Sequence, residues 1–332
     1  MPELPEVETI RRQLAPEVTG KRIVGAEILD ERLTRPEAPE PVAKRIEGRT
    51  IESVGRRGKY LLVGLEGGVT MALHLRMTGN VLLREPGEGD AGHEGRVADL
   101  METDPRLGAP RLYEASTELA HLRFRMDLDD GSELLFTDVR RFGTLVVLGG
   151  PEELDAYLAP RVGVEPLSDE LTPEALGHMA AGRTAPLKSF LLTQTDVAGI
   201  GNIYADEALF RAELHPLSPA GSMKPEHCEA LVEGIVDALE TGLAEGGASI
   251  DDYLNARGER GSMQDEFLVH TREGQECPRC DASGRHDREG KVPRIERIVV
   301  GGRSTYFCPE CQVKLRKRPK RRKRTKPRRT AA

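Results

Sequence analysis

The sequence predicts an α+β multidomain protein with three successive parts. Residues 21–148 hold short β-rich runs divided by turn residues, which predicts an antiparallel sandwich or barrel. Residues 151–245 change to a helical period, which predicts a helical region. Two Cys-x-x-Cys pairs then enclose a β-hairpin pattern near the C-terminus. A chain of 332 residues is long enough for about two domains.

A helix is expected directly after the N-terminus, with apolar residues at helical spacing and Gly20 as its stop. Ahead of it lies Pro2, which becomes the N-terminal residue if Met1 is removed. An α-amine titrates near ~8, so a fraction is nucleophilic at neutral pH, and attack on an aldehyde-level carbon gives an iminium ion. Glu3 lies beside it as a proton donor or acceptor. The alternative is an ordinary N-terminus whose acidic residues favour the start of the helix.

The β-rich part alternates aliphatic or β-branched runs with turns such as Asp129-Asp130-Gly131. A segment at residues 85–119, with Gly, Pro and acidic residues, is longer than compact domains usually tolerate, so we expect a surface insertion. The expected strands are residues 22–29, 50–55, 60–65, 69–75, 81–84, 122–128, 133–137 and 145–148.

The helical part contains a glycine-bearing turn at residues 196–201, which is expected to let backbone N–H groups approach a phosphate. Residues 248–274 have a loop-like composition. The expected helices are residues 152–158, 173–181, 186–193, 202–211 and 225–245.

The two Cys-x-x-Cys pairs predict one structural zinc ion. Cys277 and Cys280 are separated by 27 residues from Cys308 and Cys311, and the residues between them read as a hairpin. Four thiolates in this arrangement form a closed tetrahedral zinc site that has no open position for chemistry. Free or redox-active thiols are the alternative.

Five cysteines, four of them in the two Cys-x-x-Cys pairs, suit a reducing cytosol with a metal and not a disulfide framework. The chain has no apolar run of ~18 residues and no apolar signal core, so we expect neither a membrane span nor secretion, and we expect a cytoplasmic location.

Residues 314–329 carry twelve of the 48 Lys and Arg and no acid. The rest of the chain then has 36 basic against 55 acidic residues, a net charge of −19. The basic tail is expected to be disordered and to bind polyanions, or to be merely solvated.

Six motifs occur in the order found in the formamidopyrimidine-DNA glycosylase family, and the chain resembles that family from residue 2 to residue 312. They are Pro2-Glu3-Leu4-Pro5-Glu6-Val7-Glu8-Thr9, Arg57-Gly58-Lys59-Tyr60, His74-Leu75-Arg76-Met77-Thr78-Gly79, Asp138-Val139-Arg140-Arg141-Phe142-Gly143, Gly199-Ile200-Gly201-Asn202-Ile203-Tyr204-Ala205 and Gly302-Arg303-Ser304-Thr305-Tyr306-Phe307-Cys308-Pro309-Glu310-Cys311-Gln312.

The resemblance implies an N-terminal antiparallel β-sandwich, a helix-two-turns-helix domain and a C-terminal β-hairpin zinc finger. It implies excision of oxidised purines such as 8-oxoguanine from damaged double-stranded DNA, then strand cleavage by β- and δ-elimination, by a monomer associated with the nucleoid. The expected boundaries are 2–150 for the catalytic domain, 151–248 for the helical domain, 249–276 for a lesion-capping loop and linker, 277–312 for the finger and 313–332 for the tail.

The resemblance also assigns roles to single residues. It makes Pro2 the Schiff-base nucleophile, Glu3 the general acid, Glu6 a supporting carboxylate and Lys59 an essential lysine near the proline that contacts phosphates. Lys188, Asn202, Arg303 and Arg140 are implied DNA contacts. Without the resemblance, the alternative for Lys59 and Lys188 is an ordinary exposed lysine, and the alternative for Asn202 is a helix N-cap.

Base removal requires the target nucleotide to leave the stack, which opens a void in the duplex. The resemblance implies that Met77, Arg140 and Phe142 fill it as a flexible thioether, a hydrogen-bonding guanidinium and an aromatic wedge. The alternative for Met77 and Phe142 is the core of the sandwich.

Three features depart from the family pattern: the long spacing between Cys280 and Cys308, the acidic insertion and the basic tail. Two other functions remain open. One is an endonuclease VIII-like enzyme that prefers oxidised pyrimidines, and the other is a catalytically silent protein that binds damaged DNA.

Overall fold

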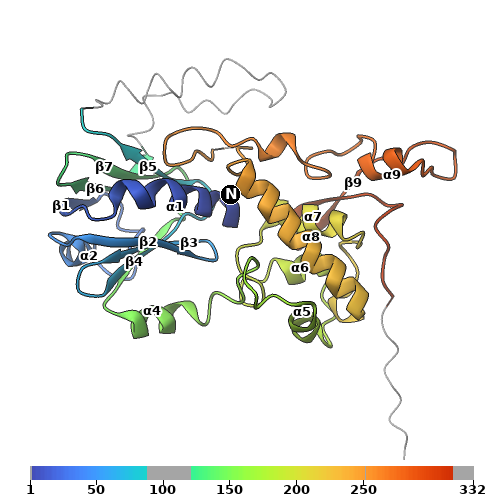
Figure 1. Cartoon of the computed structure of the whole chain (residues 1–332), viewed down its shortest axis with the longest axis horizontal. Helices are drawn as coiled ribbons and strands as arrows, with labels where there is room; N and C mark the ends of the chain where they lie inside the picture. Colours follow the sequence, from blue (N-terminus) through green and yellow to red (C-terminus); the bar gives the residue numbers. More distant parts are fainter. Residues whose placement is uncertain (1, 88–120, 251, 317–332) are drawn as a thin grey trace, which may run out of the picture.

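The computed structural model describes residues 2–87, 121–250 and 252–316. Nearly all of the expected insertion at residues 85–119, and the tail from residue 317 onward, lie outside the described residues. The described chain forms two halves, with the N-terminus at their junction (Figure 1).

The N-terminal half is a sandwich of two four-stranded antiparallel sheets, ordered β1-β6-β7-β5 and β2-β3-β4-β8. Buried aliphatic side chains and Phe124 and Phe136 fill the space between the sheets. The predicted sandwich is confirmed, and the barrel alternative is wrong, because the strands form two separate sheets. The strands are β1 Ile23–Ile28, β2 Ile51–Arg57, β3 Tyr60–Leu65, β4 Val69–His74, β5 Gly79–Arg84, β6 Leu122–Leu128, β7 Glu133–Asp138 and β8 Thr144–Leu148.

Helix α1, Leu4–Val18, belongs to both halves of the molecule. Its first residue, Leu4, lies in the core of the helical half, whereas Val7, Ile10 and Leu14 lie in the core of the sandwich. One amphipathic helix therefore anchors the N-terminal residues at the place where the two cores meet.

Two helices were not predicted from the sequence. Helix α2, Pro39–Ile46, lies in a proline-rich stretch that reads as a loop, but Pro39 stands in the first turn, where proline is tolerated. Its residues Val42, Ala43 and Ile46 are buried. Helix α9, Pro278–Ser283, is too short to show a period.

The C-terminal half is built around α7 and α8, which lie side by side (Figure 1). A Cβ atom on Gly234 would lie 2.7 Å from the carbonyl oxygen of Ala208, and one on Gly242 would lie 2.4 Å from the Tyr204 hydroxyl. Both glycines therefore allow α8 to approach α7 closely. The helices are α4 Pro151–Leu158, α5 Pro173–Ala180, α6 Leu187–Leu191, α7 Asn202–Arg211 and α8 Pro225–Ala244, with 3-10 turns η4 Ala220–Ser222 and η5 Met263–Asp265.

The segment after α8 returns to the sandwich before it enters the finger. Tyr253 and Ala256 are buried in the sandwich core, and Leu254 N donates to Asn80 Oδ1 at 3.0 Å. The finger contains α9 and the antiparallel hairpin of β9, Glu296–Val300, and β10, Arg303–Phe307. The predicted hairpin is confirmed.

Candidate active site

The side chain of Glu3 caps the N-terminus of α7. Its carboxylate accepts hydrogen bonds from the backbone N–H groups of Gly201 at 2.7 Å, Ile203 at 3.0 Å and Tyr204 at 3.4 Å. These donors are among the groups that a helix leaves unpaired at its start, where its dipole favours negative charge. Glu3 is 1% exposed, so both oxygens are held in place away from bulk water.

Glu6, one turn further along α1, holds the same junction together. Its carboxylate accepts from Glu3 N at 2.7 Å, from the Tyr204 hydroxyl at 2.8 Å and from Ala248 N at 2.8 Å. Burial raises the pKa of Glu6, and the charge of Glu3 acts in the same direction, while the three hydrogen bonds oppose the shift. The contacts suit a residue that fixes Glu3 and Tyr204.

Lys59 is buried at the junction. Its Nζ atom donates to the carbonyl oxygen of Ile200 at 3.0 Å, and 7% of the residue is exposed. Burial lowers the pKa of the ammonium, against the opposing charges of Glu3 and Glu6. The alternative of an exposed turn lysine is wrong, because the β2–β3 turn that carries Lys59 packs between the two halves and buries its side chain.

Glu165, in the connection after α4, holds that turn. Its Oε1 accepts from Gly58 N at 2.5 Å, and its carboxylate pairs with Arg56 at 2.8 Å and Arg57 at 3.3 Å. Gly58 has a φ of 56°, a backbone conformation that favours glycine. The turn therefore enters the junction as a fixed element.

The glycines of the turn before α7 have another role than the sequence predicted. We expected their N–H groups to face a phosphate, but Gly199 N donates to Gln194 Oε1 at 3.1 Å and Gly201 N donates to Glu3. A Cβ on Gly199 would lie 2.7 Å from Leu4, and one on Gly201 would lie 2.3 Å from the Glu3 carboxyl carbon. The prediction is wrong because these glycines make room for the N-terminal segment.

Lys188, expected to contact DNA, is fully buried in the C-terminal half. Its Nζ atom pairs with Asp206 Oδ1 at 2.6 Å and donates to the carbonyl oxygens of Ser304 at 3.2 Å and Asn202 at 3.4 Å. The second oxygen of Asp206 lies 2.9 Å from His270 Nδ1. Lys188 thus binds protein acceptors in this structure, and the exposed-lysine alternative is wrong.

Asn202 and Arg303 lie where α7 meets the finger hairpin. Asn202 is the first residue of α7, and its Nδ2 donates to the Ser304 carbonyl oxygen at 3.1 Å. Arg303 is exposed, and its charge lowers the pKa of both buried lysines, Lys59 and Lys188, after burial itself. The hairpin therefore brings an exposed cation to the edge of the junction.

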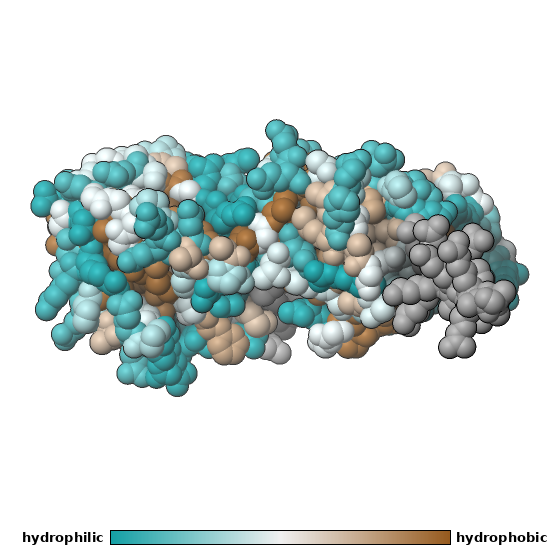
Figure 2. Space-filling view, turned by 90° about the horizontal axis from the view of Figure 1, so that it is seen from below, coloured by the Kyte–Doolittle hydropathy of each residue, from teal (hydrophilic) through white to brown (hydrophobic). Residues whose placement is uncertain are grey.

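Met77 and Phe142 are exposed, at 40% and 51%, so neither lies in the sandwich core. Met77 precedes β5 and Phe142 follows β7, and the guanidinium of Arg140 lies 4.8 Å from the centre of the Phe142 ring. The face shown in Figure 2 is largely hydrophilic with scattered apolar patches. The exposed large apolar residues of the described chain are Val24, Leu29, Met77, Phe142, Leu167, Val299 and Val313.

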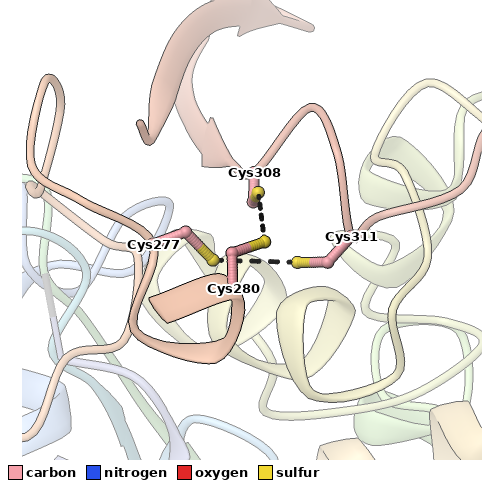
Figure 3. A group of neighbouring side chains, drawn as sticks. All are labelled: Cys277, Cys280, Cys308 and Cys311. Carbon is pink, nitrogen blue, oxygen red and sulfur yellow. Dashed lines mark hydrogen bonds between the residues drawn. The ribbon is translucent and has the colours of Figure 1, made fainter. Parts of the chain in front are cut away.

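The four predicted cysteine ligands meet in the finger (Figure 3). All four are buried, and their sulfur atoms lie within 4.8 Å of one another. The separations are 3.8 Å between Cys277 and Cys311 and 3.7 Å between Cys280 and Cys308. A tetrahedron with Zn–S bonds of about 2.3 Å has edges of about 3.8 Å, so the four thiolates fit one structural zinc ion.

Sequence reasoning did not single out His74, although it lies within a quoted motif. Its Nδ1 accepts from Arg76 N at 3.0 Å, and burial, together with the charges of Arg76 and Lys59, lowers its pKa to about 3. The imidazole is therefore neutral at physiological pH, with its proton on Nε2. The environment of this half-buried histidine cannot be recognised from a single motif letter.

Three sequence profiles match the chain in order. The Formamidopyrimidine-DNA glycosylase N-terminal domain matches residues 1–145, the Formamidopyrimidine-DNA glycosylase H2TH domain matches residues 162–253, and the zinc finger found in FPG and IleRS matches residues 294–313. The formamidopyrimidine-DNA glycosylase of Chloroflexus aurantiacus is 40% identical over 317 residues, which cover 95% of this chain and 99% of that protein. This chain belongs to the formamidopyrimidine-DNA glycosylase family.

Further relatives agree with this assignment. The formamidopyrimidine-DNA glycosylase of Gluconobacter oxydans is 39% identical over 94% of this chain and 100% of its own length. Among solved structures, a Lactococcus lactis FPG mutant bound to DNA containing Fapy-dG has a TM-score of 0.76 and 32% identity, covering 94% of this chain and 100% of its own.

The family assignment gives the function. The chain is a zinc-finger DNA glycosylase of base excision repair, with DNA as its partner and with the abasic-site lyase activity general to the family. Within the described residues, no helix is long and apolar enough to cross a membrane.

Proposed function

We propose that Pro2, after removal of Met1, is the nucleophile of this glycosylase, and that oxidised purines such as 8-oxoguanine and formamidopyrimidines are its preferred lesions. The arrangement of Glu3 carries the proposal: directly after Pro2, a buried carboxylate is fixed by three N–H donors at a helix N-terminus. The same junction buries Lys59, whose charge interacts with that of Glu3.

The proposed reaction begins with attack of the Pro2 nitrogen on C1′ of the damaged nucleotide. The bond from C1′ to the base breaks, the base takes a proton from solvent as it leaves, and the proton of the attacking amine passes to the Glu3 carboxylate. Glu3 protonates the ring oxygen, the bond from C1′ to that oxygen breaks, and an iminium ion forms. Negative charge then develops on Glu3, where the three N–H groups are already aimed, so they stabilise this step.

The iminium ion makes the C2′ proton acidic. Its loss expels the 3′ phosphate, and a second elimination expels the 5′ phosphate. Lys59 lies at the junction, where its ammonium form could contact a phosphate. Burial lowers the pKa of that ammonium, which suits transfer of a proton near Pro2.

Asn202, Arg303 and Arg140 are the proposed DNA contacts. Asn202 already donates one amide hydrogen to Ser304, so its second amide hydrogen would serve a phosphate. Lys188 donates hydrogen bonds to the carbonyl oxygens of Asn202 and Ser304. We therefore assign Lys188 to positioning Asn202 for its phosphate contact. We further propose that the enzyme acts as a monomer in the cytoplasm, associated with the nucleoid.

A second candidate is a preference for oxidised pyrimidines. One observation favours testing it: the wild-type Lactococcus lactis FPG, with a TM-score of 0.75 to this chain, has been solved with DNA containing an oxidised pyrimidine. A catalytically silent protein that binds damage is the third candidate, and the retained Pro2, Glu3 and Lys59 oppose it.

Borohydride trapping separates these candidates. Intact mass first establishes whether Met1 has been removed. We expect a covalent adduct on duplex DNA containing 8-oxoguanine, and its loss after acetylation of the N-terminus. In Pro2→Gly the adduct should be weaker but not abolished, because the remaining primary amine can still form a reducible imine. An adduct only on oxidised-pyrimidine DNA would support the second candidate, and binding without any adduct would support the third.

Replacing the acid tests its assigned role. Glu3→Gln keeps the shape of the side chain but removes the transferable proton and the negative charge. Excision of 8-oxoguanine should fall by about 10²-fold or more, within the range of general acid catalysis, while binding to the same DNA changes little. Excision at the wild-type rate would remove Glu3 from this role.

A further inference from the structure

We propose that Asp138 is a positioning residue that joins the two void-filling loops into one unit before DNA arrives. This inference rests on the proposed roles of Met77, Arg140 and Phe142 and adds the residue through which they act together. Asp138 ends β7, is 1% exposed and lies too deep to be a DNA contact itself.

The carboxylate of Asp138 accepts hydrogen bonds from both loops. Its Oδ2 accepts from Phe142 N at 2.8 Å and Gly143 N at 2.7 Å. Its Oδ1 accepts from Arg140 N at 3.1 Å and from the hydroxyl of Thr78 at 2.5 Å. Thr78 directly follows Met77 in the other loop, so one buried carboxylate connects the backbone of the Phe142 loop with the neighbour of Met77.

Thr78 strengthens this connection from its own side. Its hydroxyl oxygen also accepts from Arg140 N at 3.1 Å while its proton goes to Asp138. A single hydroxyl therefore bridges the two loops in both directions, as donor and as acceptor.

Both loops also pack against the ring of Phe136. Gly79 pairs with Asp138 at the end of the β5–β7 ladder. A Cβ on Gly79 would lie 2.8 Å from the ring of Phe136, and one on Gly143 would lie 2.6 Å from it. The absence of side chains at these two positions lets both loops close over Phe136.

Each loop holds an arginine in the left-handed region next to its void-filling residue. Arg76 has a φ of 57° and Arg141 a φ of 59°, a conformation disfavoured for residues with a Cβ atom. Arg141 is held there by two bonds from its guanidinium to Asp30, at 2.5 and 2.7 Å. Such backbone conformations persist where the surroundings fix them, often at functional sites.

The result is a pair of loops with fixed backbones and exposed tips. The side chains of Met77 and Phe142 project into solvent, and Arg140 already stacks on Phe142. Because the backbone is ordered in the free enzyme, insertion into a void requires little further ordering. Met77 and Phe142 should therefore act as a coupled pair, with Thr78 and Asp138 carrying the coupling.

A double-mutant cycle tests this inference. Met77→Ala, Phe142→Ala and the double variant are compared for the rate of base extrusion, followed by 2-aminopurine fluorescence next to an 8-oxoguanine. The cycle is measured with Thr78 present and again in Thr78→Val, which removes the hydroxyl and keeps the size. Borohydride trapping on a preformed abasic site first fixes the active concentration of each variant.

With Thr78 present we expect the two losses to deviate from multiplicativity by about 3-fold or more, as for residues in one network. In Thr78→Val the deviation should fall toward one, and in Thr78→Ser, which keeps the hydroxyl, it should persist. An unchanged deviation in Thr78→Val overturns the positioning role alone. Unchanged extrusion in both single alanine variants overturns the void-filling roles, and the present inference with them.

Discussion

The carboxylate of Glu3 lies 2.7 Å from the backbone nitrogen of Gly201, in the space that a Cβ atom on Gly201 would occupy. Glu3 is near the start of the chain and Gly201 is at the start of α7, so a contact across the two halves sets the position of the proposed acid. The glycine is required by this contact and not by its own backbone angle, since its φ of −125° suits any residue.

A methyl group at this position should therefore damage catalysis. We expect Gly201→Ala to displace the Glu3 carboxylate and to lower kcat/KM for 8-oxoguanine excision by about 10²-fold, because displacements of ~1 Å have effects of that size. The matched control is Gly150→Ala, since nothing lies within 4 Å of a Cβ on Gly150 and its φ is 177°. Normal excision by Gly201→Ala, measured in single turnovers, would contradict the fixed position of Glu3.

The buried pair of Lys188 and Asp206 should be important for stability. Lys188→Met removes the ammonium partner of the buried Asp206 carboxylate and leaves only His270 beside it, which we expect to lower the free energy of unfolding by about 3 kcal/mol in urea titrations. The double variant Lys188→Met with Asp206→Leu should lose much less. If Lys188 contacted a phosphate directly, the slope of log affinity against log salt would fall by about one, and that result would contradict the positioning role.

Asp30 should contribute acid-sensitive stability. Its hydrogen bonds to Arg141 lower the pKa of the Asp30 carboxyl from 3.8 to about 2, so the folded protein favours the ionised form more than the unfolded chain does. This stabilisation is complete above pH 3.8 and disappears as the pH falls through about 2. The difference in unfolding free energy between the wild type and Asp30→Asn should therefore shrink over that window, in acid titrations followed by circular dichroism. A constant difference would argue against the ion pair.

The basic tail should set the non-specific affinity for DNA. Residues 317–332 contain ten Lys and Arg. The residues just before them are anchored to the protein, because Leu315 packs against the helical core and Leu315 N donates to Ser218 Oγ at 2.9 Å. Truncation after Arg316 keeps this anchor. We expect weaker binding to undamaged duplex and a shallower salt dependence, by about 0.9 for each phosphate that the tail no longer neutralises. A tail of equal length with Ser for Lys and Arg is the control, and an unchanged slope would contradict the prediction.

Local patterns were sufficient to predict much of the fold. Helix α1, the eight strands of the sandwich and the finger hairpin follow from apolar periodicity and turn residues. The four cysteines predicted the zinc site because the spacing of thiolates is itself the chemical requirement. Helix α2 was missed because its prolines read locally as a loop, and its buried face is defined only by packing.

The sequence by itself determined most of the elements, the metal ligands and, through its motifs, the candidate residues of the active site. Only the tertiary structure decided how they are used. In the folded chain the N–H of Gly201 donates to Glu3 and not to a phosphate, and Lys188 is buried in an ion pair with Asp206. Hydrogen bonds of Thr78 and Asp138 connect the loop of Met77 with the loop of Phe142. The contacts of Glu3 with Gly201 and of Thr78 with Asp138 join residues distant in sequence, and the period of one segment carries no information about which distant carboxylate will accept its hydrogen bonds.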